Sequence, residues 1–554
     1  MKMTGAQIII KLLEREGIRM IAGIPGGANL PLYAALSKSK IKHILARHEQ
    51  GAGFIAQGMA RSTGQPAVCF ATSGPGATNL MTAIADAKLD SIPIIAITGQ
   101  VPTSLIGTDA FQEVDTYGMT IPITKHNFLI RNAEELLSVI PESFQLAMEG
   151  RPGPIVIDIP KDIQKQQIEI KRWPLMKKKK KKDKIDLAMI KKMTHMIQQA
   201  KKPLLYIGGG IIHSGAEKLV LELARKNSIP VTSTLMGLGA FPPDDDLFIG
   251  MLGMHGARYT NYILNEADLL LAFGVRFDDR ATGNIARFCK QARIIHIDID
   301  HSEIGKIRRS HLSLACDIAA ALKYLNPLIK RQKRKEWISF LDRMKKEHPF
   351  QIPQSSDPLN PLNLIGMISR IAQGNAIITT DVGQHQMWTA QIYPFRTPRT
   401  LLTSGGLGTM GFGLPVAIGA GLANPKRQVI CISGDGSFLM NIQELATLAE
   451  ENLNVKTIIM NNGSLGLVRQ QQEFFYDKNY MASRFITRPD FAAVAKNFGL
   501  KGIDLGKERD PEEILQKALN EKGPCLINAP IPFDQNVTPM VPPGAGNHEM
   551  IGGE

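Results

Sequence analysis

The sequence lacks a long apolar run and has few cysteines, and these two absences exclude several classes of protein. Because no stretch reaches about 18 uninterrupted apolar residues, we expect no membrane-spanning helix. The first residues lack the apolar core and cleavage site of a signal peptide, so a cytoplasmic location is expected. The five cysteines are odd in number, widely separated and free of CxxC spacing, which is typical of neither a disulfide framework nor a zinc site. We expect them to be small buried hydrophobic residues.

Basic residues outnumber acidic ones, and the net charge of +14 raises the question of a nucleic acid partner. The excess is concentrated in Lys177–Lys182 and in residues 330–335 (KRQKRK). Neither block alternates aromatic with basic side chains as a single-strand binding surface does. Solvated interdomain linkers are therefore favoured over a polyanion site, and neither nucleic acid nor a membrane is expected as a partner.

The chain repeats one pattern three times: a short Val/Ile-rich run, a Gly-rich turn and an Ala-rich helix. Runs that are apolar throughout belong to parallel sheets covered on both faces, so we predict an α/β fold with three doubly wound parallel-sheet domains. The predicted strands are KHILAR, AVCFATSG, IPIIAITG, GPIVIDIP, PLLYIGGG, IPVTST, DLLLAFGV, ARIIHIDID, AIITTDVG, QVICISGDG, VKTIIMNN and PCLINAP. The predicted limits are 1–168 for the N-terminal domain, 169–187 for a Lys-rich linker, 188–348 for the central domain, 349–357 for a second linker, 358–530 for the C-terminal domain and 531–554 for a tail that forms a surface lid or arm.

Two polar motifs end neighbouring strands of the third domain: Gly434-Asp435-Gly436 and Asn461-Asn462. The carboxyl ends of parallel strands joined by a crossover helix meet at one edge of a sheet, so Asp435 and Asn462 are predicted to lie together. A carboxylate and an amide oxygen are hard ligands that suit Mg²⁺, and the glycines allow a phosphate to approach a helix N-terminus. Either motif alone is more often only a turn. The pairing favours a site.

A competing motif, residues 406–411, fits GxGxxG, and Asp435 follows it at nearly the spacing of a dinucleotide site. This alternative predicts a nicotinamide-dependent dehydrogenase. Against it, Asp435 lies between two glycines at a helix start, and a second oxygen ligand follows one strand later.

The spacing of these two motifs resembles the thiamine diphosphate enzyme superfamily, and further segments resemble the catalytic large subunits of acetolactate synthase, also called acetohydroxyacid synthase. The resemblance covers nearly the whole chain outside the basic blocks and is carried by GIPGGANLPLY, ARHEQGAGFIAQGMAR, ATSGPGATNL, TDAFQEVD, RPGPIVIDIPKD, GVRFDDRATG, VGQHQMW, GGLGTMGFGLP and PMVPPG. It implies a transferase that decarboxylates pyruvate and condenses the hydroxyethyl unit with a second 2-keto acid, pyruvate or 2-ketobutyrate, in branched-chain amino acid biosynthesis.

The resemblance also implies a pyrimidine-binding first domain, an FAD-binding second domain and a third domain that binds diphosphate and Mg²⁺. The implied metal ligands are Asp435, Asn462 and the carbonyl of Ser464. Contacts to thiamine diphosphate are implied for Gly26, Gly27, Gln384, His385, Gly408, Met410, Gly434, Gly436, Ser437, Leu465 and Gly466. Met410, otherwise a core filler, would hold the cofactor bent, and His385 is assigned to binding rather than to base catalysis.

Glu49 is expected to end a strand and to precede the small-residue helix GAGFIAQGMA, whose surface permits close approach of another domain or subunit. A lone glutamate is most often a surface residue. By resemblance, Glu49 hydrogen-bonds N1′ of the aminopyrimidine and acts as an acid–base group in the active site of a second chain. A homodimer is then the minimum functional unit, with a tetramer and a small regulatory subunit as further implied partners.

The middle domain has glycines and acidic residues at strand ends, as either a structural βαβ domain or a dinucleotide pocket would. By resemblance, the FAD contacts are Arg151, Gly208, Gly209, Gly253, His255, Gly274, Asp278, Arg280, Asp298 and Asp317. Arg276 is expected to recognise the incoming 2-keto acid, because its planar fork suits a carboxylate. Gln112 and Lys161, with Phe111, resemble other residues of the substrate channel.

One position departs from the family: many members have a tryptophan in VRQWQ, where this chain has Gln471. Gln471 cannot supply the same apolar wall, so weaker discrimination between 2-ketobutyrate and pyruvate is expected. The alternatives on the same scaffold are a pyruvate oxidase or decarboxylase, a glyoxylate carboligase, and a non-catalytic binding subunit. RFDDR and QHQMW favour carboligation over oxidation, Glu49 speaks against glyoxylate carboligase, and intact Glu49, Asp435 and Asn462 speak against a non-catalytic chain.

Overall fold

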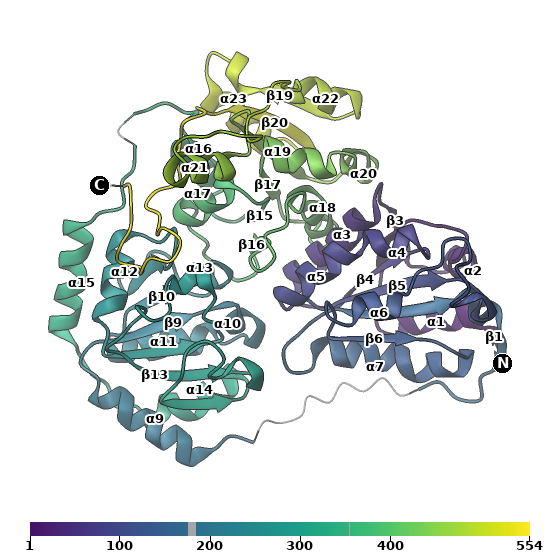
Figure 1. Ribbon diagram of the computed structural model, residues 1–554, viewed down its shortest axis with the longest axis horizontal. Helices are drawn as coiled ribbons and strands as arrows, with labels where there is room; N and C mark the ends of the chain where they lie inside the picture. The colour runs from purple at the N-terminus through teal and green to yellow at the C-terminus, as the bar shows by residue number, and fades with distance from the viewer. Residues whose placement is uncertain (175–183, 354, 554) are drawn as a thin grey trace.

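The computed structural model describes residues 1–174, 184–353 and 355–553, and in it the chain folds into three α/β units (Figure 1). Each unit is built on a six-stranded sheet in which every pair of neighbouring strands runs parallel. The predicted α/β fold with three doubly wound parallel sheets is confirmed. The Lys177–Lys182 block lies outside the described residues, so the prediction for it stays a prediction.

The first unit has the strand order β3-β2-β4-β5-β7-β6. Successive residues of its central strand belong to two different cores, Val68 to one and Cys69 to the other, so helices cover both faces. Its strands are β2 (Met20–Gly23), β3 (Lys42–Leu45), β4 (Ala67–Ala71), β5 (Ile94–Gln100), β6 (His126–Leu129) and β7 (Ile155–Pro160), with an antiparallel pair β1 (Lys2–Thr4) and β8 (Gln167–Glu169) beside them. Its helices are α1 (Gly5–Arg15), α2 (Leu30–Leu36), α3 (Glu49–Thr63), α4 (Pro75–Asn79), α5 (Met81–Leu89), η1 (Thr103–Leu105), α6 (Thr116–Thr120), η2 (Ala133–Glu135), α7 (Leu136–Met148) and α8 (Lys161–Lys165).

The middle unit has the strand order β11-β10-β9-β12-β13-β14. Its strands are β9 (Pro203–Ile207), β10 (Val231–Ser233), β11 (Phe248–Met251), β12 (Leu269–Phe273), β13 (Arg293–Asp298) and β14 (Leu312–Ala315). Its helices are α9 (Leu187–Gln199), α10 (Gly209–Ser214), α11 (Glu217–Asn227), η3 (Leu235–Gly237), α12 (Arg258–Glu266), α13 (Asp279–Thr282), η4 (His301–Glu303), α14 (Ile318–Leu328) and α15 (Lys335–Glu347).

The third unit has the strand order β16-β15-β17-β18-β20-β19. Its strands are β15 (Ile377–Thr380), β16 (Leu401–Leu402), β17 (Val429–Gly434), β18 (Val455–Asn461), β19 (Lys501–Asp504) and β20 (Cys525–Pro530). Its helices are α16 (Pro361–Ile371), α17 (Gln384–Ile392), α18 (Gly413–Ala423), α19 (Asp435–Phe438), η5 (Leu439–Asn441), α20 (Glu444–Glu451), α21 (Gly466–Phe475), α22 (Phe491–Asn497), η6 (Leu505–Lys507) and α23 (Pro511–Asn520). All strands of the three six-stranded sheets lie inside the predicted domain limits, whereas β8 extends one residue beyond the limit at 168; the limits themselves stay predictions.

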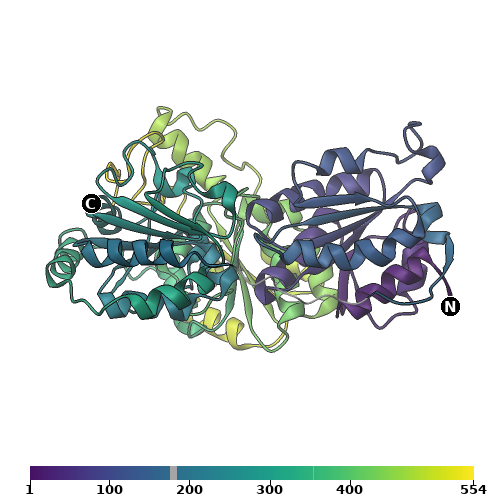
Figure 2. The same cartoon turned by 90° about the horizontal axis from the view of Figure 1, so that it is seen from below.

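Helices α3 and α18 lie side by side and join the first unit to the third (Figure 1). A Cβ atom on Gly58 would lie 2.2 Å from the Val416 carbonyl oxygen, and one on Gly419 would lie 2.0 Å from that of Ile55. Only glycine permits this approach. The buried residues of the two units form one continuous core, while the first and middle units lie on opposite sides of the molecule (Figure 2).

The expectation that Glu49 ends a strand is wrong. Strand β3 ends at Leu45, and Glu49 is the first residue of α3, with His48 as its N-cap. A carboxylate in the first turn of a helix is favoured by the helix dipole.

The second basic block, residues 330–335, is not a solvated interdomain linker. It lies inside the middle unit between α14 and α15. The buried Arg334 guanidinium donates to the carbonyl oxygens of Ile197 (2.9 Å) and Ala200 (3.2 Å) and to that of Asn227. Arg334 therefore satisfies carbonyls at the C-terminal ends of α9 and α11, where a cation is favoured.

The C-terminal tail packs on the middle unit and is not a free surface arm. It descends from the third unit and lies beside α12 (Figure 1). The buried Val541 N–H donates to the Met254 carbonyl oxygen (2.8 Å), and the buried Asn547 side chain donates to that of Ala281 (2.9 Å). The tail thereby ties the third unit to the middle one.

The sequence predicts no membrane-spanning helix and five buried cysteines without disulfides. In the described parts of the chain, no helix combines the length and apolar content needed to cross a bilayer. All five cysteines are buried and none forms a disulfide, as predicted.

Asp158 in β7 predicts a pH dependence of stability. Thr98 Oγ1 and Gln100 Nε2 donate to its carboxylate (2.6 and 3.0 Å), and burial raises its pKa to about 7. The pKa of Asp158 in the folded state exceeds the unfolded value of about 3.9, so the protonated carboxyl stabilises the folded state. This contribution to the free energy of unfolding is fully present below about pH 4 and is lost as the pH rises through 7. We expect the Tm of Asp158→Asn, relative to the unsubstituted protein, to rise between pH 5 and pH 8. A pH-independent difference would contradict this, and Asp510→Asn, at an exposed cap where asparagine serves equally, is the control.

Candidate active site

Asp435 and Asn462 follow two neighbouring strands, β17 and β18, at the same edge of the third sheet. Gly434 is paired with Met460 in the parallel register, so the residues that follow on each strand lie side by side. Asp435 opens α19, and Asn462 follows β18 directly. With Ser464, they line one small pocket, which we call the diphosphate pocket. The connection between the strands is three short helical pieces, α19, η5 and α20, rather than the single helix expected.

The Asp435 carboxylate is nearly buried. Burial raises its pKa to about 6, and backbone N–H groups, including those of Gly436 and Gly463, oppose that shift only in part. Backbone N–H groups, rather than a cationic side chain, are the main groups that favour its ionised form. Three or more His, Cys, Asp or Glu side chains of the described chain do not gather as a metal site. A buried carboxylate next to amide and carbonyl oxygens suits a hard divalent cation.

The Asn462 side chain is held in one orientation. Its Oδ1 accepts from the Ser464 N–H (3.0 Å) and hydroxyl (2.9 Å), and its Nδ2 donates to Gln384 Oε1 (3.2 Å). A Cβ atom on Gly466 would lie 2.1 Å from Gln384 Oε1, so a side chain there would displace Gln384 from this hydrogen bond. Gln384 thus positions Asn462 instead of projecting freely into the pocket.

His385, the second residue of α17, is buried, and its Nε2 has no hydrogen-bond partner among the described residues. Burial lowers its pKa to about 3, so the ring is neutral at physiological pH. Gly434 leaves room for the ring, since a Cβ atom there would lie 2.9 Å from His385 Nδ1. A neutral ring with a spare nitrogen fits the binding role expected for it.

Most of the other residues assigned to the cofactor line the same pocket. These are Gln384, Met410, Gly434, Gly436, Ser437, Leu465 and Gly466. Gly408 lies instead on the wall of a larger cavity, and Gly26 and Gly27 belong to the first unit.

Glu49 does not line the diphosphate pocket, whose walls come from residues 382–531. Its carboxylate accepts a hydrogen bond from Asn79 Nδ2 (2.9 Å). Within one chain, the structure therefore does not bring Glu49 to Asp435.

The start of α3 is held by Glu444, which sequence analysis missed. Its buried Oε1 accepts the N–H groups of Arg47 (2.9 Å) and His48 (3.0 Å). No local pattern indicates this contact, because Glu444 belongs to a different unit nearly 400 residues away.

Gln112 is close to the Glu49 end of the first unit. A Cβ atom on Gly74 would lie 2.8 Å from the Gln112 carbonyl oxygen, and one on Gly76 would lie 3.5 Å from Glu49 Oε1. Gln112 has a φ of 60°, and the neighbouring Phe111 is 89% exposed. Lys161 is half-buried at the start of α8.

A cavity of about 1660 Å³, called the large cavity below, lies between the three units. Of the residues expected to contact FAD, it is lined by Arg151, Gly209, His255, Gly274, Asp278, Arg280, Asp298 and Asp317. Gly208 and Gly253 are not among the lining residues. A Cβ atom on Gly208 would lie 2.3 Å from the Gly274 carbonyl oxygen, and Gly253 has a φ of 92°. Arg276, Gly405, Gly408 and Gln471 line the same cavity.

The large cavity carries polar groups of both signs. Arg151 pairs with Glu303 (2.8 Å) and Asp300 (3.2 Å). Burial raises the pKa of Asp298 to about 6 and lowers that of His255 to about 4. His255 Nδ1 has no partner among the described residues. A wide cavity with spare polar atoms fits a large polar ligand.

The glycine motif at 406–411 is not a phosphate cradle, which counts against the dehydrogenase alternative. The N–H groups of Gly405 and Gly406 donate to Asp90, and those of Gly411 and Gly413 donate to Asp381. A dinucleotide loop needs such groups free for the pyrophosphate. Sequence analysis missed Asp381, although it directly follows strand β15.

Comparison with known families defines the class. Residues 3–119, 190–325 and 381–529 match the N-terminal TPP binding, central and C-terminal TPP binding domains of thiamine pyrophosphate enzymes. The chain is therefore an enzyme of the thiamine pyrophosphate, or thiamine diphosphate, class.

Full-length relatives narrow the class. The chain is 56% identical to the large subunit of acetolactate synthase isozyme 1 of Escherichia coli K12, over 100% of this chain and 98% of the relative. It is 43% identical to the isozyme 2 large subunit of the same organism, over 99% of both chains. It is 46% identical to the chloroplastic acetolactate synthase 1 of Nicotiana tabacum, over 99% of this chain and 84% of the relative. The chain belongs to the acetolactate synthase large subunits, and the predicted catalytic function in branched-chain amino acid biosynthesis is confirmed.

Proposed function

We propose that Asp435, Asn462 and the backbone carbonyl of Ser464 hold Mg²⁺ on the diphosphate of thiamine diphosphate. The observation that supports this most is the convergence of the three residues on one pocket, inside the segment that matches the C-terminal TPP binding domain. The neutral His385, with its spare nitrogen, and the glycines at 434 and 436 fit a bound phosphate. Gln384, Met410, Ser437, Leu465 and Gly466 complete the walls.

Bound thiamine diphosphate supplies the electron sink that lets pyruvate lose CO₂. The role proposed for Glu49 is to hold and share a proton at N1′ of the aminopyrimidine. Because the first unit contributes nothing to the diphosphate pocket of its own chain, we propose that Glu49 of the partner subunit completes each site. Gly26 and Gly27 would face the pyrimidine from the same side. A homodimer is then the minimum assembly, and a tetramer remains compatible with it.

The acceptor 2-keto acid is proposed to bind through its carboxylate to Arg276, which lines the large cavity beside Gly406. Gln112 and Lys161 would enter the channel from the partner subunit with Glu49. Pyruvate and 2-ketobutyrate, as small anions, are attracted to such a basic entrance.

FAD is proposed to occupy the large cavity. The contacts would come from Arg151, Gly208, Gly209, Gly253, His255, Gly274, Asp278, Arg280, Asp298 and Asp317. The unpartnered His255 Nδ1 and the close glycines support a large polar ligand. Carboligation has no net redox change, so the flavin is assigned a structural role.

Product detection from pyruvate alone, in air and without oxygen, tests this chemistry. We expect 2-acetolactate at the same rate under both conditions, with no oxygen uptake. Acetate formed with oxygen uptake would favour the oxidase alternative. Accumulation of acetaldehyde would favour the decarboxylase, and condensation of glyoxylate alone would favour the glyoxylate carboligase.

Gln471, exposed on the wall of the large cavity, predicts weak acceptor selection. One methylene in a well-shaped apolar pocket is worth roughly 10-fold or more, and glutamine forms no such wall. At equal acceptor concentrations, we expect acetolactate and acetohydroxybutyrate within about 10-fold of each other. Gln471→Trp should shift the ratio towards acetohydroxybutyrate. Strong dominance of acetohydroxybutyrate in the unsubstituted enzyme would contradict the prediction.

The relatives from Escherichia coli are named large subunits. We therefore propose that this chain also binds a small regulatory subunit. The cytoplasmic location expected from the sequence stays a prediction.

A further inference from the structure

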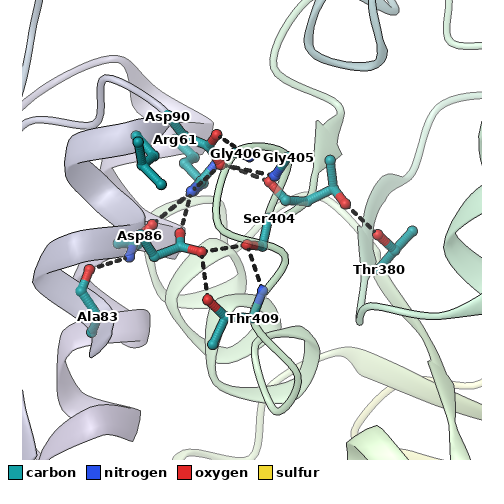
Figure 3. A network of polar contacts seen from close by, with 12 residues as sticks. Arg61, Ala83, Asp86, Asp90, Thr380, Ser404, Gly405, Gly406 and Thr409 are labelled. Carbon is teal, nitrogen blue, oxygen red and sulfur yellow. Dashed lines mark hydrogen bonds and ion pairs between the residues drawn. The ribbon is translucent and has the colours of Figure 1, made fainter. Parts of the chain in front are cut away.

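Two carboxylates of the first unit share one guanidinium in a buried cluster next to the third unit. Arg61 Nη2 lies 2.8 Å from Asp86 Oδ1 and 2.9 Å from Asp90 Oδ2. The aspartate side chains are 0% exposed and the arginine 4%. Arg61 extends from α3, and the aspartates lie on and just after α5 (Figure 3). One guanidinium thus serves two buried carboxylates, which are costly to bury unless other donors satisfy their oxygens.

Those donors come from the third unit, in the segment Thr403–Thr409, which we call the glycine loop (Figure 3). Asp90 accepts the N–H groups of Gly405 (3.0 Å) and Gly406 (2.8 Å). Asp86 Oδ2 accepts the hydroxyls of Ser404 and Thr409, the latter at 3.0 Å. Apart from Arg61, every group of the described residues that donates to these two carboxylates belongs to the glycine loop.

Further hydrogen bonds hold the glycine loop and the residues next to it. Arg61 Nη1 donates to the Thr403 carbonyl oxygen (3.0 Å), and Gln386 Nε2 donates to that of Ser404 (3.1 Å). Just beyond the loop, the Gly411 N–H donates to Asp381 (2.9 Å). Met410 therefore lies between two residues that are each bonded to a buried aspartate.

The glycine loop separates the two sites. Gly405 and Gly408 line the large cavity, whereas Met410 lines the diphosphate pocket. A Cβ atom on Gly406 would lie 3.4 Å from Arg276 Nη2, so the acceptor-binding arginine also stands beside the loop. A displacement of about 1 Å at such a place can cost 10²-fold in rate.

We infer that Arg61, Asp86 and Asp90 are positioning residues, which act through the glycine loop to fix Met410 and Gly408 against the cofactor. The inference rests on the proposed function of the diphosphate pocket. It makes the contact between α3, α5 and the third unit part of the cofactor site, and not only part of the core.

The sharpest test is a pair of substitutions at Thr409 in the flavin-loaded enzyme. Thr409→Val keeps the shape but removes the hydroxyl that donates to Asp86, whereas Thr409→Ser keeps it. Thiamine diphosphate binding with Mg²⁺ is read from the fluorescence of Trp388, which lines the diphosphate pocket. We expect Thr409→Val to raise the Kd about 10-fold and to lower kcat by at least about 10-fold, the scale of a lost bond to a charged group. Thr409→Ser should stay within about twofold in both.

Asp90→Asn adds a second variant, because an amide oxygen accepts one loop N–H while the amide nitrogen opposes the other. Asp158→Asn is its control, since that carboxylate is equally buried but bonded only to Thr98 and Gln100 of the first sheet. The inference is supported if Thr409→Val and Asp90→Asn both raise the Kd for thiamine diphosphate and lower kcat, while Thr409→Ser and Asp158→Asn change neither. Thr409→Val behaving as Thr409→Ser does, or both controls failing equally, would overturn the inference. Absence of thiamine diphosphate binding in the unsubstituted enzyme would instead overturn the proposed function.

Discussion

Glu49→Gln should lower kcat for acetolactate formation by at least about 100-fold, the usual contribution of a positioned acid–base group. The glutamine amide cannot share a proton with N1′ of the pyrimidine. Its oxygen can still accept the hydrogen bond from Asn79, so helix α3 should form normally. The measurement is kcat per bound flavin, with flavin content taken from visible absorbance.

The matched control is Glu169→Gln, the same chemical change at an exposed position of β8 in the same unit. It should leave kcat within about twofold of the unsubstituted enzyme, as most surface substitutions do. Near-normal turnover of Glu49→Gln would remove Glu49 from the mechanism. Loss of flavin together with turnover would instead indicate a damaged fold.

Most strands inside the sheets could be predicted from the sequence, whereas most edge strands could not. The exceptions are β2, which lies inside the first sheet and was not predicted, and β3, an edge strand that was predicted as KHILAR. Strands β5, β12 and β17 are apolar runs because helices cover both faces, and each was predicted. Strands such as β6 (HNFL) and β16 (two residues) lie at sheet edges, where short or polar sequences suffice. Their pairing depends on a neighbour that no local pattern identifies.

The same distinction applies to the site. Asp435 and Asn462 each end a strand, and parallel neighbours bring strand ends together, so their proximity follows from the topology. Asp90 and the glycine loop meet only because α3 packs on α18 through closely approaching glycines. That packing joins residues more than 300 positions apart and leaves no periodic signal.

Asp435→Asn should abolish productive Mg²⁺ binding. Loss of a side chain that hydrogen-bonds to a metal ligand costs roughly 10- to 100-fold in metal affinity, so loss of the charged ligand itself should lower the Mg²⁺ affinity by more than about 100-fold. The metal-free variant should be no less stable, because an amide of the same shape removes a buried charge. Calorimetric titration of Mg²⁺ with thiamine diphosphate measures the affinity, and thermal melts without metal measure the stability. The control is Asp504→Asn, at the carboxyl end of β19 in the same sheet, which should bind Mg²⁺ and thiamine diphosphate as the unsubstituted enzyme does.

Co-expression of the Glu49→Gln and Asp435→Asn chains then decides between one-chain and two-chain sites. If each site joins Glu49 of one chain to Asp435 of the other, a mixed dimer has one site with both residues intact and one with neither. Random pairing makes half of the dimers mixed, so about a quarter of the activity should return. If both residues served the same chain's site, every site would carry one substitution and no activity would return. Because Glu49 is not among the residues that line the diphosphate pocket of its own chain, we expect the first result.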